Sequence, residues 1–249
     1  MKTGETQLNS FGSEMIIVKY RKNNDIDVCF PEYNWTAEHK EYKDFKNGYI
    51  RCPYERRTYG VGFLGEGKYK ASKNGKYAKP YKAWKSMIER CYSPKYQEKQ
   101  PTYIGCEVCE EWHNFQNFAE WYEQNYYEIP GERMELDKDI LVKDNKTYSP
   151  NTCVFVSHNI NSLFTKRDAC RGNLPIGVCY IERKNIYQAE CNINGKLKWL
   201  GYYNTQEEAF NAYKQFKESY IKQLADEHIE LIPQSLYYAM YEYEVNIND

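Results

Sequence analysis

The side chains best suited to acid–base or metal chemistry gather in one short segment of the sequence. Asp137 and Asp139 are two residues apart, so on a strand both carboxylates would lie on one face and could hold a metal ion together. Lys138 stands between them and is mostly protonated at neutral pH, which makes it a poor general base unless it is strongly desolvated. The segment therefore offers two metal ligands but no good base.

Cysteines give a second candidate site. Cys106 and Cys109 are spaced as Cys-x-x-Cys and could form half of a zinc site with His113. A second pair is missing, although Cys91 or Cys153 could complete the set, and buried structural thiols are the alternative interpretation. The nine cysteines lack the spacing of a disulfide framework, so we expect free thiols in a reducing compartment.

Composition limits the class of protein. A chain of 249 residues, 41% of them hydrophobic, can build one or two domains or several small ones. Its 26 tyrosines suit small domains with thin cores and polar binding faces, because a buried tyrosine ring can keep its hydroxyl in water. No apolar run approaches the roughly 18 residues of a membrane span, and residues 1–10 do not resemble a signal peptide. We therefore expect a cytoplasmic protein.

Charge is segregated along the chain, although the net charge is only -1. Residues 68–99 are rich in Lys and Arg, residues 107–139 are rich in Asp and Glu, and no Lys or Arg follows Lys222. Such segregation can create a basic face for nucleic acid on a nearly neutral molecule. Separate solvated faces are the alternative interpretation.

The N-terminal part has the pattern of a small β module. Residues 15–20 and 25–30 are rich in β-branched and aromatic residues, and Asn47-Gly48 is a hairpin-type turn signal. Four glycines between residues 60 and 67 interrupt any long element and lack the spacing of a phosphate-binding loop. We expect a β-barrel-like module that ends near Tyr69.

The central part changes from helical to strand-like periodicity. Apolar side chains recur at helical spacing from Tyr81 to Cys91 and from Trp112 to Tyr122. Strands are expected over 136–142 and 152–156, and a short helix over 159–164. The pattern predicts a helix pair followed by a β-hairpin and a helix.

The C-terminal part has the pattern of a small sheet with a helix. Three short strands are expected, over 177–181, 187–193 and 196–202. Asn194-Gly195 is a strong two-residue hairpin signal. Thr205 and Glu208 are spaced as a capping box for a helix that continues to about Glu227. A closing helix over 236–241 is expected to pack on another unit.

This C-terminal segment resembles a known DNA-binding domain. The resemblance is carried by Gly177-Val178, Tyr187-Gln188-Ala189-Glu190, Asn194-Gly195-Lys196, Trp199-Leu200-Gly201-Tyr202-Tyr203 and Thr205 to Tyr213. The segment, Ile176 to Lys214, is similar to the apetala-two/ethylene-response-factor domain, in which a sheet lies in the major groove. The resemblance implies binding of double-stranded DNA, and a small αβ module for protein contact is the alternative.

Strand alternation separates the two faces of this expected sheet. The residues expected to face the helix are Val178, Ala189, Cys191 and Leu200, and those expected near the free face are Tyr187, Glu190, Asn192, Lys198 and Trp199. The apetala-two/ethylene-response-factor domains of plants carry several arginines on this free face. Those arginines are absent here, since the matching positions are Ile176, Cys179, Ile181, Asn192 and Leu197. The candidate DNA-binding residues are Arg183, Lys184, Tyr187, Asn192, Lys196, Lys198 and Trp199.

The central segment resembles phage proteins related to HNH homing endonucleases. The resemblance is carried by Trp84, Met87, Arg90-Cys91-Tyr92, Val108 to Trp112, Phe115, Phe118, Trp121, Leu136 to Asp139, Tyr148-Ser149-Pro150, Cys153, Phe155 and Asn161. An HNH nuclease needs a histidine base beside a metal-holding acid, and the resemblance places Asp137 at the acid and Lys138 at the histidine. The candidate catalytic residues are Asp137, Lys138, Asp139 and Asn161. The candidate metal ligands are Asp137 and His158, with Mg²⁺ if the protein is an active nuclease.

These patterns predict an α+β protein of four segments. They are an N-terminal β-barrel-like module (1–70), an HNH-like module of a helix pair plus ββα (71–170), a three-stranded antiparallel sheet with a packed helix (171–228) and a closing segment (229–249). The expected function is that of a phage-type modular protein that binds double-stranded DNA in the cytoplasm of a bacterial host, with a degenerate HNH-like core. One alternative is an active metal-dependent homing or nicking endonuclease. Another is an inhibitor of a host nuclease or defence complex, acting by protein contact or DNA mimicry.

Overall fold

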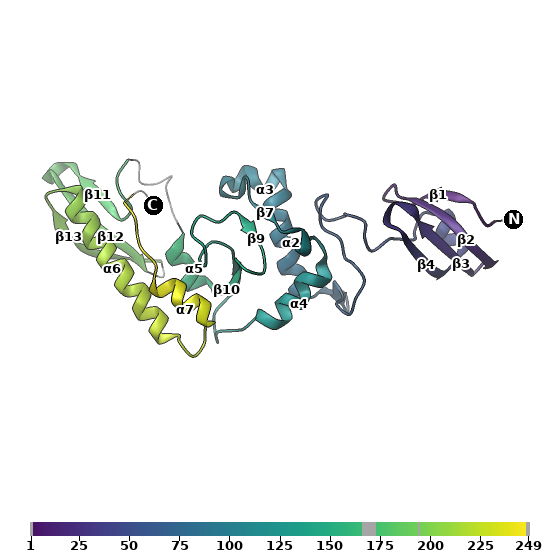
Figure 1. The fold of residues 1–249 in the computed structure, drawn as a ribbon. Coiled ribbons are helices and arrows are strands. Elements are labelled where there is room, and N and C mark those ends of the chain that lie inside the picture. Colours follow the sequence, from purple (N-terminus) through teal and green to yellow (C-terminus); the bar gives the residue numbers. More distant parts are fainter. Residues whose placement is uncertain (1, 166–172, 194, 248–249) are drawn as a thin grey trace. The chain divides into compact units, whose positions relative to one another are not determined.

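The computed structural model describes residues 2–165, 173–193 and 195–247 (Figure 1). These residues form a mixed α+β structure with seven α-helices and several small sheets, which confirms the expected fold class. Asn194 of the expected hairpin turn and the expected boundary at residues 170–171 lie outside the described residues. Among the described residues, no helix combines the length and the apolar character needed to cross a membrane.

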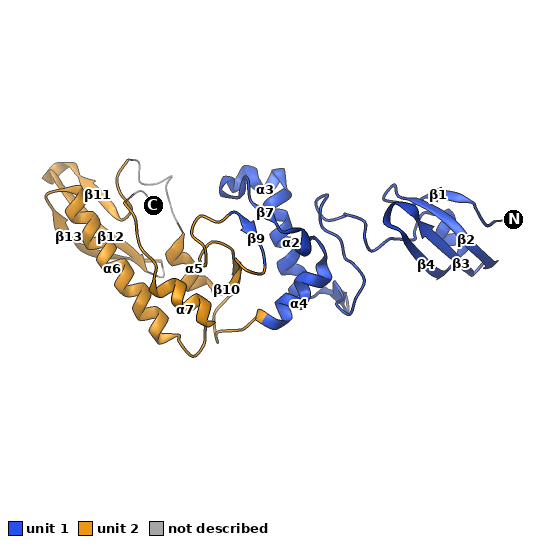
Figure 2. Ribbon diagram, viewed as in Figure 1, with its two compact units in different colours: residues 1–124, 146–149 blue, residues 125–145, 150–249 orange. Residues whose placement is uncertain are grey.

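The chain divides into two compact units (Figure 2). The first contains residues 1–124 and 146–149, and the second contains residues 125–145 and 150–249. The second unit thus begins inside the segment expected to form the HNH-like module, and four residues of that segment return to the first unit.

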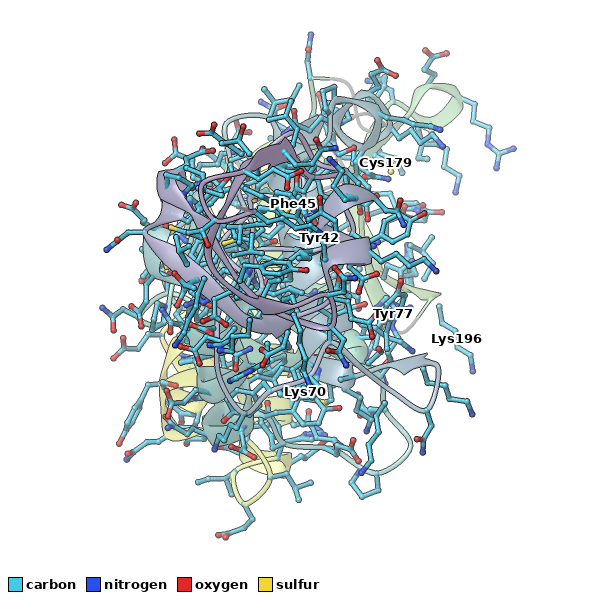
Figure 3. The ribbon with its side chains drawn as sticks, turned by 90° about the vertical axis from the view of Figure 1, so that its right-hand side faces the viewer. Tyr42, Phe45, Lys70, Tyr77, Cys179 and Lys196 are labelled. Atoms are coloured by element: carbon cyan, nitrogen blue, oxygen red, sulfur yellow. The ribbon has the colours of Figure 1, made fainter. Side chains whose placement is uncertain are left out.

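The first unit opens with a four-stranded antiparallel sheet in the order β1-β2-β3-β4. Its elements are β1 (Thr6–Leu8), β2 (Glu14–Lys22), β3 (Asp25–Phe30), β4 (Trp35–Lys40) and the following helix α1 (Tyr42–Lys46). Because β1 and β4 are opposite edges, the sheet is open, and the expected barrel-like closure is wrong for the described residues. Phe45 is fully buried in the core of this sheet beside Tyr42 (Figure 3).

The turn signal Asn47-Gly48 has a different role from the one expected. Asn47 ends α1, and its backbone N–H donates to the carbonyl of Lys43. Gly48 follows with a φ of 69°, a left-handed conformation that suits glycine after a helix. The pair therefore terminates a helix and does not join two strands.

The rest of the first unit is mainly helical. Its elements are β5 (Ser72–Lys73), β6 (Lys76–Tyr77), α2 (Lys79–Tyr92), α3 (Pro94–Lys99), β7 (Glu107–Val108), α4 (Phe115–Asn125) and β9 (Thr147–Tyr148), which pairs in parallel with β7. The apolar side chains that recur at helical spacing are buried as expected. They are Trp84, Met87, Ile88 and Cys91 in α2 and Phe115, Phe118, Ala119 and Tyr122 in α4. Trp112 is fully buried on the short turn before α4, and its carbonyl accepts a 2.7 Å hydrogen bond from Trp84 Nε1.

The second unit combines a hairpin–helix with a three-stranded sheet. Its elements are β8 (Met134–Asp137), β10 (Val154–Ser157), α5 (His158–Phe164), β11 (Val178–Ile181), β12 (Ile186–Ile193), β13 (Lys196–Tyr203), α6 (Gln206–Glu227) and α7 (Gln234–Tyr241). Strand β8 pairs with β10 in antiparallel fashion, and β12 lies between β11 and β13. The strand expected over 136–142 ends at Asp137, because the chain turns there.

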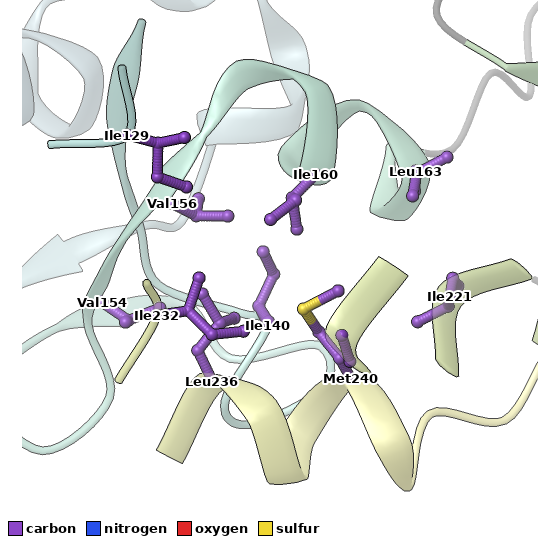
Figure 4. Close-up of a cluster of buried hydrophobic side chains, with 11 residues drawn as sticks. Ile129, Ile140, Val154, Val156, Ile160, Leu163, Ile221, Ile232, Leu236 and Met240 are labelled. Atoms are coloured by element: carbon purple, nitrogen blue, oxygen red, sulfur yellow. The ribbon is translucent and has the colours of Figure 1, made fainter. Parts of the chain in front are cut away.

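Helix α6 packs in two hydrophobic cores. Its first half contributes Ala209, Phe210 and Tyr213 to a core with Val178, Ala189 and Cys191 of the three-stranded sheet. Its second half contributes Ile221 and Ala225 to a core with β10, α5 and α7 (Figure 4). The helix begins with the expected capping box, in which the Glu208 N–H donates to Thr205 Oγ1 at 3.2 Å.

A substitution at Gly62 tests how tightly the core around Trp84 is packed in the first unit. A Cβ at residue 62 would lie 2.8 Å from Cζ2 of the buried Trp84, so Gly62→Ala overpacks this core. We expect the free energy of unfolding in urea to fall by about 1–3 kcal/mol. The loss should shrink in a Trp84→Phe background, because the smaller ring frees the space. Equal losses in both backgrounds would contradict this contact.

Candidate functional site

The free face of the three-stranded sheet is set by the alternation of the central strand β12. Tyr187, Ala189, Cys191 and Ile193 belong to the core shared with α6. The intervening side chains Gln188, Glu190 and Asn192 therefore lie on the opposite, free face. They form a row of three polar groups at alternate positions along the middle of the sheet.

A β-bulge in β13 sets which aromatic residues join this row. Glu190 pairs with Trp199 and Ala189 pairs with Gly201, so Leu200 is the extra residue between them. Gly201 has a φ of 145°, a conformation that a residue with a side chain rarely adopts. Because of the bulge, Trp199 and Tyr202 lie on the same face, with ring centroids 5.4 Å apart.

The free face is exposed and mostly uncharged. Trp199 is 59% exposed, Leu197 is 62% exposed and Tyr202 is 47% exposed. Glu190 is the central charged group, and it accepts from Gln188 Nε2 at 2.7 Å and from Cys179 Sγ at 3.4 Å. Burial and the neighbouring Glu190 carboxylate raise the pKa of the Cys179 thiol, so this thiol stays protonated.

Two of the residues expected on the free face lie on the helix side. Tyr187 packs into the core beneath the sheet. Lys198 pairs with the buried Cys191, and its Nζ lies 4.5 Å from the ring centroid of Phe216 of α6. The expectation placed positions 187 and 190 on one face, which a regular strand does not allow because they are an odd number of residues apart.

Cations lie at the margins of the free face. Lys184, in the 3₁₀ turn between β11 and β12, places its Nζ 4.4 Å from the ring centroid of Tyr202. Arg183 is exposed in the same turn, and Lys196 is exposed at the start of β13 (Figure 3). Asn192 Oδ1 accepts from the backbone N–H of Gly195, which leaves the amide nitrogen of Asn192 as a donor for a ligand.

Asp137 caps a turn at the end of β8. Its Oδ1 accepts from the backbone N–H groups of Asp139 and Ile140, each at 2.8 Å. Burial, and then the nearby Asp139 carboxylate, raise the pKa of Asp137 from 3.8 to about 6. Side-chain capping of this kind competes with strand pairing, which explains why β8 ends here.

Lys138 points into the protein and holds the following loop. Its side chain is 8% exposed, and its Nζ donates to Asp139 Oδ2 at 2.9 Å and to the carbonyl of Asn145 at 3.0 Å. Asn145 Nδ2 donates back to the Lys138 carbonyl at 2.6 Å. These bonds give Lys138 a structural role in holding the loop that follows β8.

Glu135, which the sequence patterns did not single out, brings two predicted residues together. One Glu135 oxygen lies 3.1 Å from His158 Nδ1, and the other accepts from Asn161 Nδ2 at 2.8 Å. Arg133 also pairs with Glu135. Burial alone would raise the pKa of Glu135, but hydrogen bonds from Asn161, Arg133 and His158 outweigh it and lower the pKa. The pairing of β8 with β10 places Glu135 opposite Val156, just before α5. Knowledge of this register would have predicted the contacts of Glu135 with His158 and Asn161.

The predicted metal ligands Asp137 and His158 bind different protein groups. Within the described residues, one group of three acid, cysteine or histidine side chains lies close enough to share a metal ion, namely Asp25, Asp27 and His39. The Arg21 guanidinium already binds both acids of that group, at 2.7 and 2.6 Å. In the same described part of the chain, Asp137 and His158 belong to no such group of three, and the expected Mg²⁺ centre stays a prediction.

The expected zinc ligands have protein partners. Cys106 is buried, and its Sγ lies 3.8 Å from the Thr102 carbonyl. His113 Nε2 lies 3.1 Å from the Val108 carbonyl. Burial raises the pKa of the Cys109 thiol, which disfavours the thiolate that zinc requires. The geometry supports the alternative interpretation of structural thiols.

Asp137 predicts a pH-dependent stability. Between about pH 4 and 6 the folded protein keeps a proton that the unfolded chain loses, so stability falls as the pH rises through this window. Asp137→Asn keeps the capping oxygen and removes the charge. Since one pKa unit corresponds to about 1.4 kcal/mol, we expect this variant to be up to about 3 kcal/mol more stable at pH 7 and unchanged near pH 3. Thermal unfolding against pH measures this.

The matched control for this prediction is Glu242→Gln, which removes an exposed charge from the same unit. It should leave the stability difference between pH 3 and pH 7 unaltered. An Asp137→Asn variant that is less stable than the wild type at pH 7 would mean that the fold stabilises the ionised carboxylate.

Comparison of the chain with protein-family models, with curated proteins and with solved structures returned no match.

Proposed function

We propose that the protein binds double-stranded DNA through the free face of the β11-β12-β13 sheet. The carrying observation is the row of Gln188, Glu190 and Asn192, flanked by the exposed rings of Trp199 and Tyr202. Small sheets of this width can enter the major groove. Gln and Asn can pair with the edge of adenine, and Glu can accept from the amino group of cytosine.

Phosphate contacts come from the margins of the sheet in this proposal. Arg183 and Lys184 lie beside one end of the central strand, and Lys196 lies at the other end. Such cations fix the position of a protein on the duplex without specifying sequence. The central Glu190 carboxylate repels phosphates, so the polar row suits base edges better than the DNA backbone.

The remaining expectations stay predictions. They are the phage origin, the cytoplasmic location in a bacterial host and a degenerate HNH-like core, together with the alternatives of an active endonuclease and of an inhibitor of a host nuclease or defence complex. The hydrogen-bonded Lys138 offers no support for a catalytic base, and the exposed apolar groups Leu197 and Trp199 would also suit a protein partner.

A gel-shift titration with random duplex DNA tests the proposal. We expect Trp199→Ala to weaken binding roughly tenfold or more at about 50 mM salt, because aromatic and base-edge contacts are each worth about 1–3 kcal/mol. The control Tyr238→Ala removes a ring of similar exposure, 52%, from α7 and should bind like the wild type.

Glu190→Gln sharpens this test. Loss of the carboxylate should strengthen binding to random duplex and weaken any preference for cytosine-containing sites. The proposal fails if the wild type binds no duplex at about 50 mM salt, or if Trp199→Ala binds as tightly as Tyr238→Ala does.

A further inference from the structure

A second basic surface lies in the first unit, at the β5–β6 hairpin and the start of α2. Residues 68–88 contain seven lysines and no Asp or Glu. We call residues 70–82 the basic hairpin. Lys70, Lys73, Lys76 and Lys82 are exposed there, and none of them forms an ion pair within the described part of the chain. Lys68, by contrast, pairs with Glu123.

The turn of the hairpin places two lysines side by side. Asn74 and Gly75 both have positive φ, 52° and 74°, as in the tight turn that joins two strands with matching twist. Lys73 and Lys76 are direct partners across the two strands. Like charges in directly opposite positions destabilise a hairpin, so this pair lowers stability when the protein is alone.

The start of α2 adds positive potential to the same surface. Its first turn contains the exposed Lys82 and no acidic residue, although the helix dipole is positive at this end. The N-cap residue Ala78 provides no side-chain hydrogen bond. Cations at this end of a helix cost stability, and a bound anion offsets that cost.

An aromatic group completes the surface. Tyr77 is 57% exposed and packs against Tyr81, with ring centroids 5.2 Å apart and the ring planes tilted by 41°. Lys85 Nζ lies 6.0 Å from the Tyr77 ring, which supports the ring from the helix. Figure 3 labels two residues of the basic hairpin, Lys70, which lies before β5, and Tyr77, which lies on β6.

We propose that the basic hairpin is a second DNA-contacting surface, which binds the phosphates of duplex DNA. Like-charge pairing across the hairpin, cations at a helix N-terminus and unpaired exposed lysines are each relieved by one polyanion. This inference rests on the proposed function in that both surfaces would bind duplex DNA, but it depends on different residues in the other compact unit.

The salt dependence of DNA binding tests the inference. The triple variant Lys70→Gln/Lys73→Gln/Lys76→Gln removes up to three phosphate contacts. The negative slope of log K against log salt should therefore become less steep, by about 3. The matched control Lys22→Gln/Lys95→Gln/Lys99→Gln removes three exposed lysines of the same unit and should keep the wild-type slope.

Thermal unfolding separates lost binding from lost folding. Lys73→Gln/Lys76→Gln should unfold at the same temperature as the wild type or higher, because the like-charge pair is gone. A hairpin variant that binds DNA with the same slope as the control variant overturns the inference. The inference is also overturned if the wild-type protein binds vesicles of anionic phospholipid and the hairpin variant leaves the salt dependence of DNA binding unchanged.

The two proposals fail separately in this design. If Trp199→Ala weakens DNA binding and the hairpin variant does not change the slope, the sheet proposal survives and the inference falls. If the hairpin variant makes the slope less steep and Trp199→Ala has no effect on DNA binding, the inference survives and the sheet proposal falls. If the wild type binds no duplex at about 50 mM salt, both fall.

Discussion

The second unit depends on one helix that is buried in two cores at once. The first half of α6 packs beneath the three-stranded sheet, and its second half packs against β10, α5 and α7. Its 22 residues span about 33 Å at 1.5 Å per residue, long enough to reach both cores. The face that carries Trp199 is therefore supported by the same helix that packs against β10 and α5.

The C-terminal chain reinforces this arrangement. Leu236 and Met240 of α7 are fully buried in one core, and Val245, a few residues later, is buried in the other. The Val245 carbonyl accepts from Lys214 Nζ at 2.9 Å, and its N–H donates to Glu218 Oε1 at 2.8 Å. Both partners lie on α6, so the chain end fastens to the helix that joins the two cores.

Much of the fold could be predicted from periodicity, and the exceptions have local causes. The stripes of α2 and α4 and the capping box of α6 depend on regular spacing within one element, which a sequence displays directly. The bulge at Leu200 breaks that spacing, because Gly201 shifts the register and turns Tyr202 to the free face. An alternation rule that assumes a constant period cannot include such a shift.

The candidate site was harder to predict for the same kind of reason. Asp137 and Asp139 were expected on one strand, but the Asp137 carboxylate binds two backbone N–H groups and ends β8, so Asp139 lies beyond the strand. Glu135 was overlooked because its partners, His158 and Asn161, come from a helix more than 20 residues later, and only the pairing of β8 with β10 brings them together.

The short parallel pair of β7 and β9 makes the first unit discontinuous in sequence. The chain leaves this unit after residue 124, returns for residues 146–149 and leaves again. Tyr148, from the returning segment, is buried with its ring 5.2 Å from the Arg90 guanidinium of α2. The chain therefore passes between the two units three times, so no single peptide-bond cleavage can separate them with each intact.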